Sequence, residues 1–450
     1  MHLRTPITLD YTLYDLYSID NEQANTVLVY NPIQTEDNGV ASQAKFTYQY
    51  TLQDENKTAE SLKMLSAKLV PQRYGFSAGR MSLVIPDLDV QCNDNMHPDY
   101  TDVVQNLAQL PTFQQPNVGF EKDLKSLSLR PGAHIAVMFP ADCLLHLPHI
   151  VDPSIHFEIL SKRGLALSGL PTPVSKVIDT ILSPSDVHDP DLRRSEVARM
   201  TYQIEKQPLP FFVKLPQTVS GVGVFEVLTD TDRTRVKAIL DRHLGDMLRR
   251  INDLNYDIHP CSLVLQEHIR GTVMALSMFV TKKGRPIFIA CCKQRFDEDH
   301  HWTGGTISYK QQRHLEKFYA NTVYKVAEFL HRKGYYGPAG IDVITDQGGN
   351  NYVVDLNVRI TGTYHLGLLG GHFVQRGLFE VTMVTRYFDC FRTTFEETFA
   401  KEIQNGSLII SGWVHDELTG HSCAAINVGG RDSLRMEQTL NKVKAFALPD

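Results

Sequence analysis

The feature that most constrains this chain is a pair of β-rich runs joined by a glycine turn, between Gly340 and Arg359. The first run is Gly340-Ile341-Asp342-Val343-Ile344, and the second is Tyr352-Val353-Val354-Asp355-Leu356-Asn357-Val358-Arg359, with Gly348-Gly349 between them. This pattern predicts an antiparallel hairpin. Because side chains alternate along a strand, Asp355, Asn357 and Arg359 share one face, and a register that pairs Asp342 with Asp355 or Asn357 adds the second carboxylate.

That face of the predicted hairpin gathers two carboxylates, an amide oxygen and a guanidinium. Its apolar neighbours indicate a mostly buried strand, where a carboxylate is costly unless it is paired or bound to a metal. Mg²⁺ takes oxygen ligands and often lies between one or two carboxylates and the phosphates of a nucleotide. The alternative is a solvated hairpin with charges at its rim. We favour the metal site because acid, amide and arginine alternate on one face.

Composition excludes several classes of protein. The chain has 450 residues, 42% hydrophobic and 21% charged, which is typical of a globular protein with two or three domains. A net charge of −6 argues against a general nucleic-acid binder. We see no signal peptide and no apolar run near the ~20 residues that span a bilayer. Seven scattered cysteines without a CxxC pair indicate reduced thiols and a cytoplasmic location.

Residues 1–152 are expected to form an N-terminal α/β domain. Apolar runs at 26–30 and 134–139 predict buried strands, residues 60–70 predict a helix, and 89–115 are expected to be irregular. No glycine-rich fingerprint follows either strand, so no nucleotide is assigned here. His146 and His149 flank a proline, and solvated or core histidines explain them better than a metal pair.

Two lysines mark the next segment, 153–270. Lys162 lies in a helix expected at 155–167, and Lys214 lies in an apolar strand at 211–216. Glycines after that strand let backbone N–H groups approach phosphates, and the lysine adds a point charge. A plain hairpin turn is the commoner meaning of such glycines. A helix is expected at 229–254.

The remaining segments are 271–400 and 401–450. Strands are expected at 263–269, 273–281 and 287–293, then a polar, mobile loop at 295–306 that contains Trp302, and an amphipathic helix at 311–333. The last fifty residues are expected to form a small α/β extension with a strand near 407–410.

In this order, the motifs Lys162, Lys214 with its glycine loop, Gln266-Glu267-His268-Ile269, Lys293, Asp342 and Asp355-Leu356-Asn357-Val358-Arg359 resemble the ATP-grasp superfamily. The resemblance covers roughly residues 156–400 and is strongest to stand-alone carboxylate–amine ligases, including fungal biosynthetic ones. It implies an α/β (α+β) fold: an N-terminal pre-ATP-grasp domain, an N-lobe at 153–270, a C-lobe with the metal-binding hairpin at 271–400, and the extension.

The resemblance also implies roles for individual residues. The two lysines hold the phosphates of ATP, and Arg359 steadies the reacting carboxylate or phosphate, with Lys293 expected at the γ-phosphate. The residues implied to bind ATP are Lys162, Lys214, Ser220, Gly221, Gly223, Gln266, Glu267, His268, Ile269 and Val354. The implied ligands of two Mg²⁺ ions, with Mn²⁺ as a substitute, are Asp342, Asp355 and Asn357.

The sequence departs from relatives at three positions. No acidic residue follows the hinge in Gly271-Thr272-Val273 to hold the ribose, so Thr272 or Arg270 is expected there. Gly340 stands where D-alanine ligases have an arginine, which argues against such a substrate. Asp355 replaces the commoner glutamate, and its shorter arm would shift the second metal.

The expected activity is ATP-dependent joining of a carboxylate to an amine through an acyl phosphate, with ADP and phosphate released. The expected partners are a small carboxylic acid and an amine or amino acid, not nucleic acid or a membrane, and a homodimer is left open. Two alternatives are carboxylate activation with a non-amine acceptor and a degenerate nucleotide-binding regulator. The intact set Asp342, Asp355, Asn357 and Arg359 argues against the regulator.

Overall fold

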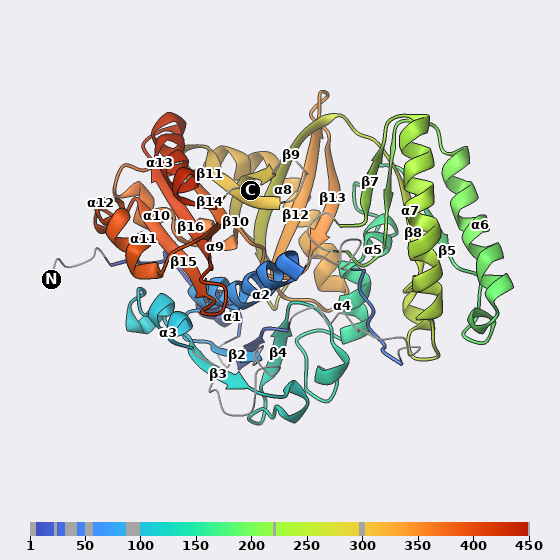
Figure 1. The fold of residues 1–450 in the computed structure, drawn as a ribbon, viewed down its shortest axis with the longest axis horizontal. Helices are drawn as coiled ribbons and strands as arrows, with labels where there is room; N and C mark the ends of the chain where they lie inside the picture. The colour runs from blue at the N-terminus through green and yellow to red at the C-terminus, as the bar shows by residue number, and fades with distance from the viewer. Residues whose placement is uncertain are drawn as a thin grey trace.

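The computed structural model describes residues 6–21, 25–31, 43–49, 57–86, 100–218, 222–296 and 302–448. These residues form three β-sheets. In Figure 1 the first sheet lies at the bottom, the second at the right, and the third runs from the centre to the left. The mixed α/β class expected from the sequence is confirmed.

The first sheet is parallel and belongs to the N-terminal domain, at the bottom of Figure 1. Its strand order is β3 (Asn117–Glu121), β2 (Ser82–Pro86), β1 (Thr26–Val29) and β4 (His134–Val137). The chain moves outward from β1 to β2 and β3 and then returns to the other side of β1, so the strand order reverses between β1 and β4. The helices of this domain are α1 (Leu13–Ser18), α2 (Lys57–Ala78) and α3 (Thr101–Leu107).

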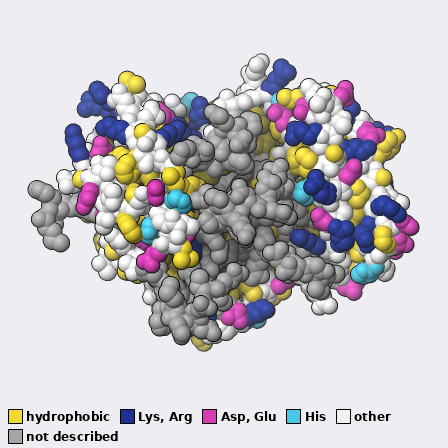
Figure 2. Space-filling view, viewed as in Figure 1, with side chains coloured by type: hydrophobic (Ala, Val, Ile, Leu, Met, Phe, Trp, Pro, Cys, Tyr) yellow, Lys and Arg dark blue, Asp and Glu magenta, His cyan; other side chains and the backbone are white. Residues whose placement is uncertain are grey.

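The second sheet is antiparallel, with the order β5 (Ser175–Asp179), β8 (Ser262–Glu267), β6 (Phe211–Lys214) and β7 (Val224–Val227). Two helices, α6 (Pro190–Lys206) and α7 (Asp230–Arg249), pack together and share a core with it. Helix α7 begins with a capping box in which the Thr229 and Asp232 side chains each accept from the other's backbone N–H. Figure 2 shows acidic and basic side chains interspersed over this part of the surface. Two ion pairs within these helices are Arg199–Glu196 and Arg233–Asp230.

The third sheet has eight antiparallel strands. They follow the order β13 (Asn351–Asn357), β12 (Gly337–Asp346), β9 (Gly271–Val280), β10 (Pro286–Phe296), β11 (Trp302–Ser308), β14 (Glu380–Phe388), β16 (Ser422–Gly430) and β15 (Leu408–His415). Helix α8 (Tyr309–Arg332) buries its apolar side against one face of this sheet, and α13 (Ser433–Phe446) packs on β14 and β16. On the other face, α2 packs against β15, β16 and α9, which joins the N-terminal domain to the large sheet.

Shorter helices connect these layers. Asp152 caps α4 (Pro153–Leu160), whose first residue is a proline, and α5 (Lys162–Ala166) follows after one residue. The others are α9 (Tyr364–Leu368), α10 (Gly370–Val374), α11 (Arg392–Thr398) and α12 (Ala400–Gln404), with 3₁₀ turns at Thr112–Gln114, Leu124–Ser126, Asp142–Leu144, Asp186–His188 and Tyr256–Ile258. Within the described ranges, no helix is long and apolar enough to cross a membrane.

Four expectations need correction. The helix at 155–167 is broken at Ser161 into α4 and α5, and helix α3 lies inside the stretch expected to be irregular. The expected mobile loop at 295–306 is largely strand, because β10 and β11 pair directly on either side of the undescribed residues 297–301. The C-terminal strands β15 and β16 are not a separate unit, since β16 pairs with β14 and extends the large sheet.

Candidate active site

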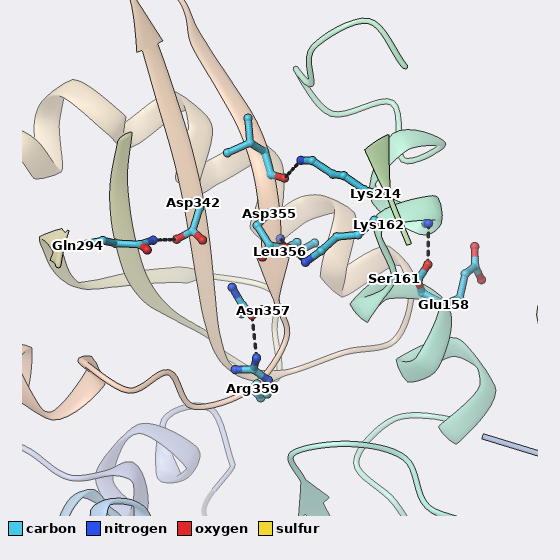
Figure 3. A network of polar contacts seen from close by, with 12 residues as sticks. Glu158, Ser161, Lys162, Lys214, Gln294, Asp342, Asp355, Leu356, Asn357 and Arg359 are labelled. Atoms are coloured by element: carbon cyan, nitrogen blue, oxygen red, sulfur yellow. Dashed lines mark hydrogen bonds and ion pairs between the residues drawn. The ribbon is translucent and has the colours of Figure 1, made fainter. Parts of the chain in front are cut away.

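The predicted hairpin consists of β12 and β13, and Asp342 lies directly opposite Asp355. The intervening apolar residues Ile341, Val343 and Val353 are fully buried beneath α8. Asp342 alternates with Ile341 and Val343, and Asp355 alternates with the buried Leu356, so the two carboxylates lie on the opposite face. Figure 3 shows them side by side on neighbouring strands. The pairing expected from the sequence is therefore confirmed.

A β-bulge lies directly beside this pair. The register steps from Asp342–Asp355 to Val343–Val353, which leaves Val354 as the extra residue on β13. The Val354 carbonyl is thereby free of the β12 ladder, and it accepts a 2.9 Å hydrogen bond from the Lys214 ammonium. The bulge thus gives a lysine of the second sheet a fixed contact on the hairpin.

The two lysines approach the hairpin from the same side in Figure 3. Ser161 breaks the helix and its Oγ accepts from the N–H of Gly164 at 2.7 Å, which places Lys162 at the start of α5. Lys162 forms an ion pair with Asp355. Burial, and then the neighbouring charge of Lys162, lower the pKa of Lys214 to about 8. Lys214 is therefore still mostly protonated at neutral pH.

The two carboxylates differ in charge state because their surroundings differ. Burial, and then the charge of Asp355, raise the pKa of Asp342 to about 7. Burial would also raise the pKa of Asp355, but the charge and hydrogen bond of Lys162 lower it below its ordinary value. Asp342 has no cationic partner within hydrogen-bonding distance in the described chain; it accepts a 2.7 Å hydrogen bond from the Gln294 amide.

Asn357 and Arg359 continue the same face at the end of β13. The Arg359 guanidinium donates to Asn357 Oδ1 at 2.9 Å and lies 5.1 Å from the ring centre of Phe139, a residue of the N-terminal domain. The backbone between them is fixed by His156, whose Nε2 is 2.8 Å from the Val358 carbonyl and donates to it. Burial lowers the pKa of His156 to about 4, so the ring is neutral at physiological pH.

This donor set fits a divalent cation. Two facing carboxylates and one amide oxygen are hard oxygen ligands of the kind that Mg²⁺ prefers. The like charge that raises the pKa of Asp342 is the repulsion that a bound cation would relieve. Asp342, Asp355 and Asn357 are therefore the residues that would hold the metal, and Lys162 and Lys214 add positive charge beside it.

The segment Gln266 to Ile269 connects the second and third sheets, since β8 ends at Glu267 and β9 begins at Gly271. The Gln266 amide donates to Ser175 Oγ at 3.0 Å. His268 stacks on Phe212, with ring centres 5.2 Å apart, and its Nε2 lies 2.8 Å from a Glu226 oxygen. The segment thus has the position expected of a hinge between lobes, while its contact with adenine stays a prediction.

The glycine loop is described only in part. Ser220 and Gly221 lie outside the described residues. Gly223 has a φ of +72°, and a Cβ atom there would lie 2.6 Å from the Thr218 side chain, so the turn requires glycine.

The structure places Gln294, and not Lys293, beside Asp342. Lys293 is exposed and lies on the same face of β10 as Cys291, which packs under α8. Gln294 lies on the other face of β10, which is the face of the two carboxylates. This register disfavours a phosphate contact by Lys293. The sequence analysis did not identify Gln294 as a site residue. If the face of β10 that carries Cys291 had been known, alternation along the strand would have placed Gln294 on the opposite face, beside Asp342.

Other residues remain apart from the site. His146 and His149 each place Nε2 3.0 Å from a backbone carbonyl, of Leu127 and Leu144, as expected for histidines without a metal. Cys291 and Cys292 lie in two different core clusters on opposite faces of β10, as alternation along a strand requires.

Comparison with protein families identifies the kind of domain to which the hairpin belongs. Residues 245–363, which include the hinge and the whole hairpin, match the family model of the ATP-grasp domain. This segment therefore resembles an ATP-grasp domain, and the resemblance inferred from the motifs is confirmed over these residues. No curated protein matches it in sequence.

Several solved structures are similar over most of their length. They include an L-amino acid ligase from Bacillus licheniformis (11% identity, TM-score 0.49, covering 94% of this chain and 98% of that one) and biotin carboxylase from Campylobacter jejuni (9%, 0.49, 95% and 92%). Another is N5-carboxyaminoimidazole ribonucleotide synthetase from Thermus thermophilus (12%, 0.48, 82% and 93%). Since one fold supports many reactions, these names do not identify the substrates of this chain.

The raised pKa of Asp342 leads to a stability prediction. Between the ordinary value of 3.8 and about 7, the folded state binds a proton that the unfolded state has lost, so stability falls as pH rises through this window. Asp342→Asn removes the free-energy cost of ionising this buried carboxyl. We expect its melting temperature in EDTA at pH 8 to exceed the wild-type value by roughly 5–10 °C, with near equality at pH 4.

Asp346→Asn is the matched control, because Asp346 lies at the exposed turn of the same hairpin and contacts Asn350 instead of the site. The Asp342→Asn variant should also lose the stabilisation that added Mg²⁺ gives to the wild type. An equal rise in melting temperature at pH 4 and pH 8 would mean that ionisation of Asp342 does not destabilise the folded protein, and so that its pKa is not raised.

Proposed function

We propose that this protein is an ATP-dependent ligase that joins a carboxylic acid to an amine through an acyl phosphate and releases ADP and phosphate. The observation on which this rests is the convergence of Lys162, Lys214, Asp342 and Asp355 beside Arg359 on one face of the hairpin. Bound Mg²⁺ would neutralise phosphate charge and polarise the transferring group.

The chain's own residues would position the reactants. Lys162 and Lys214 would bind the β- and γ-phosphates, and the hinge from Gln266 to Ile269, with Val354, would bind the adenine. Arg359 would orient the acid's carboxylate toward the γ-phosphorus, because its planar fork matches two carboxylate oxygens. Phosphoryl transfer then proceeds by positioning and charge stabilisation without a protein nucleophile.

The six cysteines within the described ranges are free thiols, which supports our proposal of a reducing, cytoplasmic environment. The test of the function is a matrix of acids and amines scored by phosphate release. Acid-dependent release that increases with one class of amine supports ligation. Acid-dependent release that no amine affects would favour a non-amine acceptor instead.

If Lys214 binds the phosphates of ATP, its removal should weaken the binding of ATP more than that of adenosine. Lys214→Ala should weaken ATP binding at least about tenfold and adenosine binding less than about twofold, because the ammonium contacts phosphate and not the base. Isothermal titration with both ligands measures this. Lys176→Ala is the control, since Lys176 lies on the same sheet but contacts Gln203 at the surface. Equal losses for ATP and adenosine would indicate a structural role for Lys214.

A further inference from the structure

A second arginine, Arg73 of helix α2, carries a charge that the mechanism above does not use. Its Nε and Nη1 atoms are buried and have no hydrogen-bond partner among the described residues. Burial lowers the pKa of this guanidinium, but an arginine stays protonated at neutral pH. The residue as a whole is partly exposed, so a ligand can reach it. A largely buried cation without a counter-charge destabilises a fold, and such local conflicts are expected mainly at binding sites.

The ionisable groups around Arg73 do not supply the missing negative charge. Those close enough to affect its pKa are the hydroxyls of Tyr30 and Tyr74 and the thiol of Cys423 on β16. Phenols are uncharged at neutral pH, and burial raises the pKa of Cys423 to about 12. Burial also lowers the pKa of His365, which lies near Arg73, to about 4, so this ring is neutral. The guanidinium is therefore uncompensated in this part of the chain.

Strand register places Arg73 over the same face of the large sheet as the metal ligands. Paired residues of adjacent strands share a face, and the pairing runs across the sheet from Asp342 to Ala275, Cys292, Ile307, Val381 and Gly429. Cys423 lies an even number of positions from Gly429 along β16, so its side chain points to that face as well. Arg73, which lies close to Cys423, is on this side of the sheet.

The two neighbours of Arg73 in the sequence fix its place relative to Arg359. The Gln72 side chain donates to the carbonyl of Trp413 at 2.7 Å and accepts from its N–H at 3.0 Å, which ties α2 to β15. The Tyr74 hydroxyl donates at 3.4 Å to the carbonyl of the residue that follows Arg359. Burial raises the pKa of Tyr74, and the charges of Arg359 and then Arg73 oppose this rise. Tyr74 thus lies near two guanidinium groups.

We propose that Arg73 binds a second carboxylate of the substrate pair, one that ATP does not activate. The proposal rests on the proposed function and adds the substrate class: either the amine is an amino acid, or the acid is a dicarboxylate. A guanidinium held in place can donate two parallel hydrogen bonds to such a carboxylate. A substrate without this group would leave the charge of Arg73 unpaired, so the site discriminates against it.

The first test asks whether Arg73 lacks a partner in the free protein. Arg73→Met keeps much of the length of the side chain and removes an uncompensated charge, so we expect it to raise the melting temperature without substrates by roughly 2–5 °C. Arg199→Met is the matched control and should lower the melting temperature, because Arg199 pairs with the buried Glu196. A fall for Arg73→Met comparable with that of the control would show a structural arginine and overturn the proposal.

The second test measures kcat/KM, at saturating ATP and Mg²⁺, for probes that differ in one carboxylate. In the acid arm, succinate and glutarate are compared with butyrate and valerate, with hydroxylamine as the acceptor. In the amine arm, glycine, L-alanine and L-phenylalanine are compared with their amides as acceptors for the preferred acid. We expect the probe with the extra carboxylate to be favoured at least about tenfold in one arm.

Arg73→Met should abolish that preference while KM for ATP stays unchanged, and Arg199→Met should keep it. Arg73→Lys retains the charge without the two parallel donors, so it should keep a weaker preference. This variant also keeps the test informative if methionine at this position prevents folding.

The outcomes separate the two claims. The arm in which the preference appears identifies the source of the carboxylate. If neither arm shows a preference, or if the Arg73 variants leave it intact, the function stands and the assignment of Arg73 is overturned. If no pair of acid and acceptor gives ADP, the proposed function fails, and the assignment fails with it.

Discussion

Asp355→Asn is expected to reduce the rate of ATP turnover at least about 100-fold, equivalent to roughly 2.7 kcal/mol of transition-state stabilisation. Asp355 is one of two carboxylates that would hold the metal, and it also holds Lys162 by an ion pair. The neutral amide weakens both interactions. Steady-state ADP release with the preferred acid measures the loss.

The same substitution should also destabilise the protein. Lys162 is only 8% exposed, so losing its partner leaves a buried charge without compensation. Asp346→Asn on the same hairpin controls for a general effect of removing an aspartate. A variant at position 355 that folds and retains more than about a tenth of the wild-type rate contradicts the metal assignment.

Arg359→Ala is expected to suppress formation of the acyl intermediate at least about 100-fold while the Kd for ATP changes less than about threefold. The reason is geometric, because the guanidinium lies beyond the metal ligands, against Phe139, and not near the hinge. Hydroxamate yield without an amine, together with titration of ATP, measures the two quantities separately.

Arg359→Lys tests whether the guanidinium must form two parallel hydrogen bonds to the carboxylate, because lysine keeps the charge but cannot form that bidentate pair. It should recover less than about a tenth of the activity. Arg285→Ala controls for loss of an arginine, since Arg285 pairs with Asp20 at the surface of the large sheet. A parallel loss of ATP affinity and hydroxamate yield in Arg359→Ala would assign this arginine to the nucleotide instead of the acid.

Local pattern predicted the parts of the site that lie on a single element. Alternation on β13 predicted which of its side chains share a face, and the apolar runs around Lys214 predicted the strand that presents it. These predictions succeeded because a one-residue slip would have moved the buried Leu356 and Val358 to the face of the carboxylates.

The parts that escaped prediction depend on contacts between distant segments. Gln294, His156 and Phe139 reach the hairpin from three different segments of the chain, and no spacing in the sequence relates them to Asp342 or Arg359. The joining of β16 to β14 was also not predictable, because strand order is set by packing and not by the pattern within each strand.

The measurement that tests the central claim most directly is the identity of the nucleotide product. With ATP, Mg²⁺, the preferred acid and hydroxylamine, but no amine, we predict equal amounts of ADP and hydroxamate. This follows from the arrangement of two lysines and the metal ligands around the terminal phosphates, with Arg359 facing the γ-phosphorus. Formation of AMP and pyrophosphate in place of ADP would show an acyl adenylate and contradict the mechanism proposed here.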